Sequence, residues 1–176
     1  LQRLVAAQRL QQDTPGARET LTQWLVRNPD DADARIALGL LDVAEKQWPA
    51  ARRTFEQVLA STPAHPVALT ALAKVYDRLD DPRALALAER GHQALQGDPF
   101  SADTLGWILV RKQRVQQGLA LLEDAHQARP EDPDIAYHYA YALAEAGLKD
   151  KAHAAAAALL RKNLAFDARE ETETLL

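Results

Sequence analysis

The stretch ADARIALGLLDVAEKQWPAARRTFEQVLASTP, residues 32–63, decides the fold of this chain. Counted from its first residue, Leu38 and Gly39 take positions 7 and 8, Ala51 takes position 20 and Phe55 takes position 24. Small residues at positions 8 and 20 let two helices cross closely, whereas the larger residues fill the space between layers. The stretch therefore predicts two helices that pack as one pair.

The stretch ends at a proline that recurs at the same point of the pattern. Pro29 and Pro63 are 34 residues apart, which is the period of the tetratricopeptide repeat, a two-helix unit. Pro63 and Pro130 are 67 residues apart, so one unit between them is a residue short, and Gln96 stands where proline is expected. A unit this short cannot bury its own apolar face. It must stack on its neighbours, and the stack makes a surface suited to holding another molecule.

We therefore predict an all-α protein, an α-solenoid of about five tetratricopeptide helix pairs closed by a C-terminal capping helix. The predicted pairs form a single superhelix over residues 1–176 and are residues 1–31, 32–65, 66–98, 99–132 and 133–164. Asp167 and Glu170 resemble a capping box that starts the last helix, residues 167–176. The chain begins at Leu1 and contains no methionine, so we expect it to be a piece of a longer protein.

Local signals predict several helix ends. Four dipeptides join a residue that can cap a helix to a proline whose φ suits the first turn: Thr14-Pro15, Asp81-Pro82, Asp98-Pro99 and Asp132-Pro133. Gly147, at position 15 of its unit, is expected to end a first helix in the left-handed conformation.

The composition limits the classes of partner. The chain is 47% apolar and 26% charged with a net charge of −4, and it has no basic cluster, so we expect no nucleic-acid partner. It has no cysteine, which excludes disulfides and thiol chemistry. No apolar run approaches the roughly 20 residues that span a bilayer, so we expect no direct membrane insertion by this part of the protein.

No motif predicts catalysis. The histidines do not have the spacing of metal ligands; they are His65, His92, His126, His138 and His153. No glycine-rich phosphate loop is present. Asp134 and His138, four residues apart on one helix, are expected to form an exposed pair rather than a catalytic dyad. We predict no enzyme activity, no metal and no cofactor.

In this fold the first helix of each pair lines a concave groove. Six residues at its inward positions are the predicted partner-binding residues: Lys74, Arg78, Trp107, Arg111, Tyr137 and Tyr141. Tryptophan and tyrosine offer rigid contact area with a polar edge, suited to an extended peptide or to sugar rings. Equally, Trp107 and Tyr141 could pack on each other and narrow the groove. Trp24 is expected in the core and Trp48 at a helix junction.

The C-terminal two-thirds, about residues 60–176, resembles one group of bacterial tetratricopeptide-repeat proteins. The resemblance rests on DPRALALAER at 81–90, DTLGWILV at 103–110, IAYHYAYALA at 135–144, and the closing Phe166, Arg169, Glu170, Glu171, Leu175 and Leu176. These segments are similar to the lipoproteins associated with exopolysaccharide export and the PEP-CTERM/exosortase sorting system. The resemblance implies an exported, membrane-anchored scaffold in the periplasm or cell envelope, with its anchor in a preceding part of the chain.

Together these features favour a non-catalytic scaffold that binds a protein or peptide partner in its groove. Direct carbohydrate binding is one alternative. A structural spacer within a longer array, with self-association through the repeat ends, is another.

Overall fold

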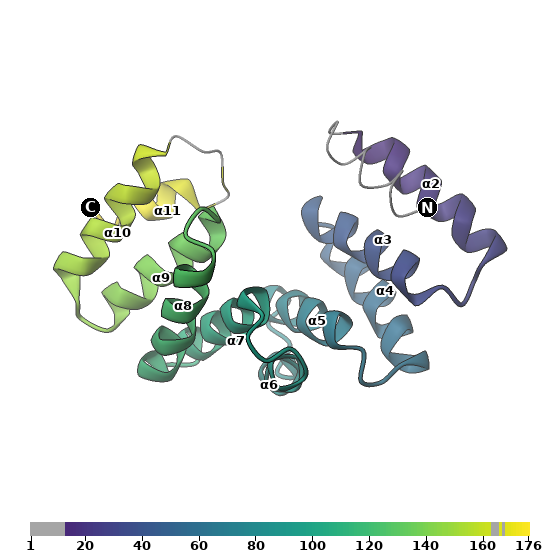
Figure 1. The fold of residues 1–176 in the computed structure, drawn as a ribbon, viewed down its shortest axis with the longest axis horizontal. Coiled ribbons are helices and arrows are strands. Elements are labelled where there is room, and N and C mark those ends of the chain that lie inside the picture. The colour runs from purple at the N-terminus through teal and green to yellow at the C-terminus, as the bar shows by residue number, and fades with distance from the viewer. Residues whose placement is uncertain (1–12, 163–165, 167) are drawn as a thin grey trace. The chain divides into compact units, whose positions relative to one another are not determined.

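The computed structural model describes residues 13–162, 166 and 168–176, and all regular structure in these residues is helical (Figure 1). The helices are α2 Thr14–Arg27, α3 Ala32–Ala44, α4 Trp48–Ser61, α5 Pro66–Arg78, α6 Ala84–Ala94, α7 Pro99–Arg111, α8 Val115–Ala128, α9 Pro133–Glu145, α10 Lys149–Arg161 and α11 Arg169–Glu173. The all-α prediction is confirmed. Residues 1–12 of the predicted first pair, and Asp167 of the predicted capping box, lie outside the described residues.

The chain divides into two compact units, Leu1–Gly91 and His92–Leu176. In the first unit α3 packs against α4, α4 packs against α5, and α3 also contacts α5. In the second unit α7 packs against α8, α8 against α9 and α9 against α10, and α7 contacts α9 directly. Within each unit, therefore, the first helices of consecutive pairs touch, as stacked repeats do. The division into five repeats and one superhelix stays a prediction.

Small residues lie where paired helices cross, as the sequence predicts. A Cβ atom on Gly118 would lie 2.5 Å from the carbonyl oxygen of Gly106, and one on Gly106 would lie 3.0 Å from that of Gly118. In the first unit, a Cβ on Gly39 would lie 2.8 Å from the ring of the fully buried Phe55. Larger side chains at these crossings would force the helices apart.

Two of the predicted helix starts are confirmed. The Asp98 carboxylate caps α7 and accepts a hydrogen bond from the Ser101 N–H at 2.8 Å. The Asp132 carboxylate caps α9 and accepts one from the Ile135 N–H at 3.3 Å.

The other two predicted starts are wrong. The N-cap of α2 is Asp13, which accepts the Gly16 N–H at 2.9 Å, so Thr14 is already helical. Asp81 is followed by a turn before α6 begins at Ala84, and its carboxylate accepts the backbone N–H of Arg83 at 3.0 Å and also binds the Arg83 guanidinium.

After each first helix the chain turns through the left-handed region. Gly147, after α9, has a φ of +77°, as predicted. The residues at the same position after α3, α5 and α7 are not glycine, yet their φ values are +57°, +53° and +64°: Lys46, Asp80 and Gln113. This conformation strains any residue that has a Cβ. Three of these four turns are therefore strained.

Trp24 is not a core residue, contrary to the sequence expectation. Its side chain is 37% exposed, and its Nε1 donates to the Asp31 carboxylate at 2.7 Å. Asp31 also caps α3 by accepting the Ala34 N–H at 2.9 Å. Trp24 therefore links α2 to the start of α3 from the surface. Trp48 is the first residue of α4, which fits the expected junction.

Candidate functional site

Four aromatic side chains gather between α7 and α9; we call Trp107, Tyr137, His138 and Tyr141 the aromatic cluster. Trp107 on α7 stacks on His138, with ring centres 4.2 Å apart, and meets Tyr141 edge-on at 5.3 Å. The Tyr137 ring lies 5.8 Å from that of Trp107 and 6.1 Å from that of Tyr141. All three α9 rings thus approach the single tryptophan of α7.

A buried polar contact holds the cluster in place. His138 is only 5% exposed, and its Nδ1 lies 2.8 Å from Oδ1 of Asp103, which is 7% exposed. The expected exposed pair between His138 and Asp134 is therefore wrong, because His138 points inward to α7 rather than along its own helix. The contact joins two consecutive first helices and fixes the imidazole against which Trp107 stacks.

The cluster extends from the core to the surface. Tyr137 is buried and packs with Ala136 and Leu159, while Trp107 and Tyr141 are partly buried against this group. Phe166 also packs there. The possibility that Trp107 and Tyr141 pack on each other is confirmed. The parts of these two rings that stay exposed are what the cluster offers to another molecule.

Charged side chains lie beside Tyr141. Burial raises the pKa of the Tyr141 hydroxyl, the Glu145 carboxylate raises it further, and the positive charge of Arg111 acts to lower it. Arg111 is the exposed last residue of α7. The second unit therefore brings together four of the six predicted groove residues: Trp107, Arg111, Tyr137 and Tyr141.

The other two predicted residues, Lys74 and Arg78, lie on α5 in the first unit. Lys74 is half-buried and Arg78 is exposed. The Arg78 guanidinium carbon lies 5.9 Å from the centre of the Trp48 ring, a cation–π distance. Being four residues apart, the two cations share one side of α5, separate in sequence and in unit from the aromatic cluster.

The pairing of Asp103 with His138 escaped the sequence analysis. A usable signal was their separation of 35 residues, about one repeat, which places them on adjacent first helices. Among the described residues no three His, Cys, Asp or Glu side chains gather as a metal site. No helix in the described ranges is long and apolar enough to cross a membrane.

Two family models, each described as a tetratricopeptide repeat, match the sequence over residues 8–75 and 104–170. No curated protein matches it.

Several solved structures share the fold. The thermophilic tetratricopeptide-repeat protein TTC0263 from Thermus thermophilus aligns over 98% of this chain and 95% of its own, with a TM-score of 0.76 and 18% identity. PilW, described as a type IV pilus biogenesis factor, aligns over 98% of this chain and 80% of its own, with a TM-score of 0.77 and 16% identity. YrrB, described as having an unusual peptide-binding site, aligns over 90% of this chain and 82% of its own, with a TM-score of 0.61 and 17% identity. These similarities confirm the predicted α-solenoid.

Proposed function

Because this chain belongs to the tetratricopeptide-repeat family, we propose that it is a non-catalytic scaffold that binds an extended segment of a partner protein across α7 and α9. The aromatic cluster carries this proposal. The close crossing of α7 with α8 is made by Gly106 and Gly118, whereas the rings lie where α7 meets α9. Partly exposed tryptophan and tyrosine anchors on a rigid support are typical centres of binding energy.

The geometry favours a peptide over a sugar. A sugar ring stacks on an open aromatic face, and His138 already covers one face of Trp107 at 4.2 Å. The cluster instead offers ring edges, the Tyr141 hydroxyl and the nearby charges of Arg111 and Glu145, which suit backbone and side-chain groups of a peptide. YrrB, which shares the fold, is itself described as having a peptide-binding site.

We further propose a setting in the cell envelope, within an exopolysaccharide-export or protein-sorting assembly. The support is the resemblance of residues 60–176 to the lipoproteins of those systems. PilW, described as a pilus biogenesis factor, shares the fold.

Peptide selection from a random display library on the purified chain tests the binding role. Selected peptides are remeasured by fluorescence anisotropy against Tyr141→Ala and against Tyr139→Ala, a matched truncation on α9 where the ring stacks on His126 instead. We expect Tyr141→Ala to weaken binding about tenfold or more and Tyr139→Ala to leave it unchanged. The melting temperature of Tyr141→Ala should move by only a few degrees.

Peptides that bind Trp107→Ala and Tyr141→Ala as tightly as the original chain would contradict the proposal. Binding on a glycan array that is lost in Trp107→Ala would support the carbohydrate alternative. Self-association without any peptide or glycan ligand would support the spacer.

A further inference from the structure

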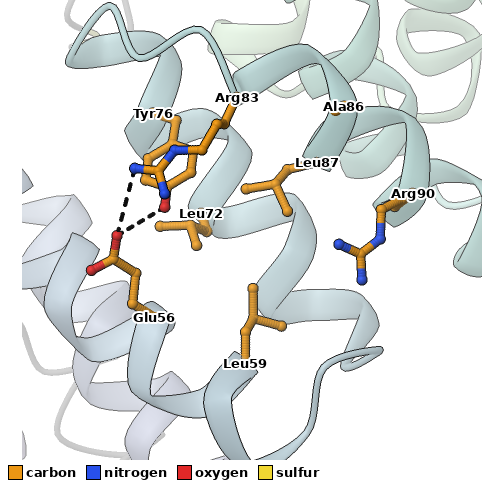
Figure 2. A pocket seen from close by; sticks show the side chains of 8 residues that line it. All are labelled: Glu56, Leu59, Leu72, Tyr76, Arg83, Ala86, Leu87 and Arg90. Carbon is orange, nitrogen blue, oxygen red and sulfur yellow. Dashed lines mark hydrogen bonds and ion pairs between the residues drawn. The ribbon is translucent and has the colours of Figure 1, made fainter.

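The first unit holds a cavity of about 410 Å³ between α4, α5 and α6 (Figure 2). Its lining residues are Glu56, Leu59, Leu72, Tyr76, Arg83, Ala86, Leu87 and Arg90. The volume is in the usual range of ligand pockets. On α5, Leu72 and Tyr76 face away from Lys74 and Arg78, because two residues along a helix turn its face by about 200°. The cavity is therefore distinct from the predicted groove.

Three leucines make the middle of the cavity apolar. Leu72, at its base, is 2% exposed, and Leu59 and Leu87 are half-buried. Figure 2 shows Leu59 and Leu87 reaching into the space from α4 and α6. A leucine or phenylalanine side chain placed there would exchange water for contact with all three leucines.

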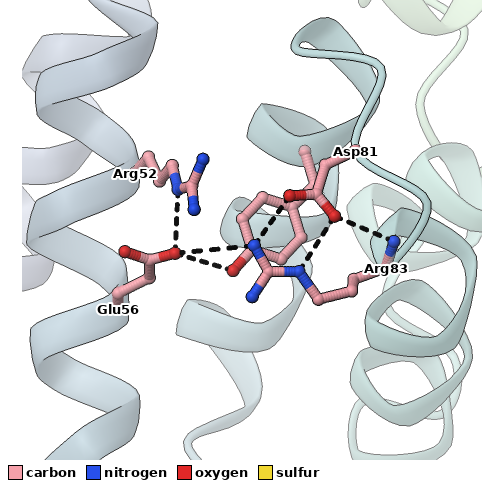
Figure 3. Close-up of polar contacts among 5 residues, drawn as sticks. Arg52, Glu56, Asp81 and Arg83 are labelled. Carbon is pink, nitrogen blue, oxygen red and sulfur yellow. Dashed lines mark hydrogen bonds and ion pairs between the residues drawn. The ribbon is translucent and has the colours of Figure 1, made fainter.

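A charge-balanced network closes one end (Figure 3). Oε1 of Glu56 accepts hydrogen bonds from Arg52 Nε at 2.9 Å and from the Tyr76 hydroxyl at 2.8 Å. The Arg83 guanidinium binds the Asp81 carboxylate at 2.9 and 2.7 Å and lies over the Tyr76 ring at 4.3 Å. Burial, and then Glu56, raises the pKa of Tyr76 to about 12, so its hydroxyl stays a donor. Two arginines thus face two carboxylates.

The opposite end carries a cation without a carboxylate. The Arg90 guanidinium donates to the carbonyl oxygen of Pro63 at 2.8 Å, and within the described part of the chain no acidic side chain lies within ion-pair distance of it. Figure 2 shows Arg90 across the leucines from Glu56. The forked guanidinium is suited to binding a carboxylate with two parallel hydrogen bonds. An acidic group is therefore the natural complement of this end.

We propose that the cavity is a second binding site, for an internal peptide segment of a partner protein in which a leucine- or phenylalanine-sized residue lies within one helical turn of Asp or Glu. The apolar side chain fills the space between the leucines, and the carboxylate binds Arg90. Oε2 of Glu56, which has no partner among the described residues, accepts a backbone N–H of the segment. Arg83 does not compete for the acidic group because Asp81 already neutralises it.

The test measures fluorescence anisotropy of short labelled peptides with the full chain. Each peptide is acetylated and amidated, and carries one Leu and one Glu, adjacent or one helical turn apart, in a Gly/Ser background. We expect the peptides with one of these Leu–Glu spacings to bind. Replacing Glu by Gln in that peptide should weaken its binding about tenfold. Arg90→Gln in the protein should weaken binding of the Glu peptide to the same extent. Binding of the Gln peptide should stay unchanged, since glutamine at position 90 can still donate to the carbonyl oxygen of Pro63.

Arg53→Gln is the matched control, because Arg53 is an exposed arginine of α4 that does not line the cavity. It should leave binding unchanged, whereas Leu87→Asp should abolish it. The site is disproved if no peptide binds, if Arg53→Gln and Arg90→Gln weaken binding equally, or if Trp107→Ala removes it. The last outcome would assign the peptides to the aromatic cluster, so the two proposals fail separately.

Discussion

The imidazole of His138 on α9 binds the carboxylate of Asp103 on α7 across 2.8 Å, and both side chains are buried. The contact crosses from one helix pair to the next, and Trp107 stacks on the same imidazole. A buried polar group is tolerated only while its partner is present, because it has already lost its water. The pair therefore favours the single arrangement of α7 against α9 in which both groups meet.

Asp103→Ala should lower the free energy of unfolding by about 2–3 kcal/mol, since it leaves a buried imidazole nitrogen without its partner. Urea unfolding followed by circular dichroism measures this. Asp134→Ala is the control. That residue is exposed in the first turn of α9, and its loss should cost at most about 0.5 kcal/mol. Equal effects of the two substitutions would show that His138 depends on Asp134 after all.

Gln113→Gly should raise the free energy of unfolding by about 1 kcal/mol. Gln113 has a φ of +64°, which glycine adopts without the strain that a Cβ imposes. The reciprocal change, Gly147→Ala, should lower stability by a similar amount. A Cβ there would meet nothing within 4 Å, so the loss reports backbone strain alone. A destabilised Gln113→Gly protein in thermal unfolding would refute the explanation.

Gly106→Leu should disrupt the packing of α7 on α8. Already the first side-chain atom would lie 2.8 Å from Leu122 and 3.0 Å from the Gly118 carbonyl oxygen, and overpacking of this kind costs about 1–3 kcal/mol or more. Differential scanning calorimetry should show a lowered transition. Ala120→Leu introduces the same side chain at an exposed position of α8 and should be nearly neutral. Similar losses from both would show that the loss does not come from the crossing, since leucine favours a helix more than glycine does.

His126 should make the protein less stable in acid. Burial, and next the charge of Lys162, lowers the pKa of the His126 imidazole in the folded state. Its stabilising contribution is complete above the unfolded pKa of about 6.5. It is lost as the pH falls from there through the folded pKa, because the unfolded chain takes up a proton that the folded chain resists.

Melting temperatures between about pH 7.5 and pH 5 measure this dependence. His126→Leu removes both the titrating group and a buried Nδ1 that has no hydrogen-bond partner in the described residues. The melting temperature of the variant should therefore depend less on pH. An unchanged profile would assign the acid sensitivity to other groups.

Much of the fold could be predicted because its determinants act locally. The Asp-Pro starts of α7 and α9 impose their geometry on residues within a turn, and the glycines at the crossings act between two helices that are consecutive in the chain. The prediction failed at Asp81, where a turn separates the residue from the start of α6. It also failed at Trp24, where a hydrogen bond to Asp31 holds an aromatic residue at the surface.

The candidate sites could be predicted only in part. Position within the repeat correctly placed Trp107, Tyr137, Tyr141 and Arg111 near one another, because neighbouring first helices repeat the same geometry. The partner of His138 and the Arg90 cavity depend on which side chains meet across different helices. Spacing along one helix contains no such information.

Within each unit a helix touches the helix next to it along the chain or the one after that, as α3 touches α4 and α5, and α7 touches α8 and α9. Contacts that are short in sequence form quickly, and their energies add nearly pair by pair. Each helix pair thus carries the instructions for its own placement. Gain or loss of a whole pair would lengthen or shorten the surface offered to a partner, while the remaining pairs kept their structure. The size of the binding surface can therefore change without a change of fold.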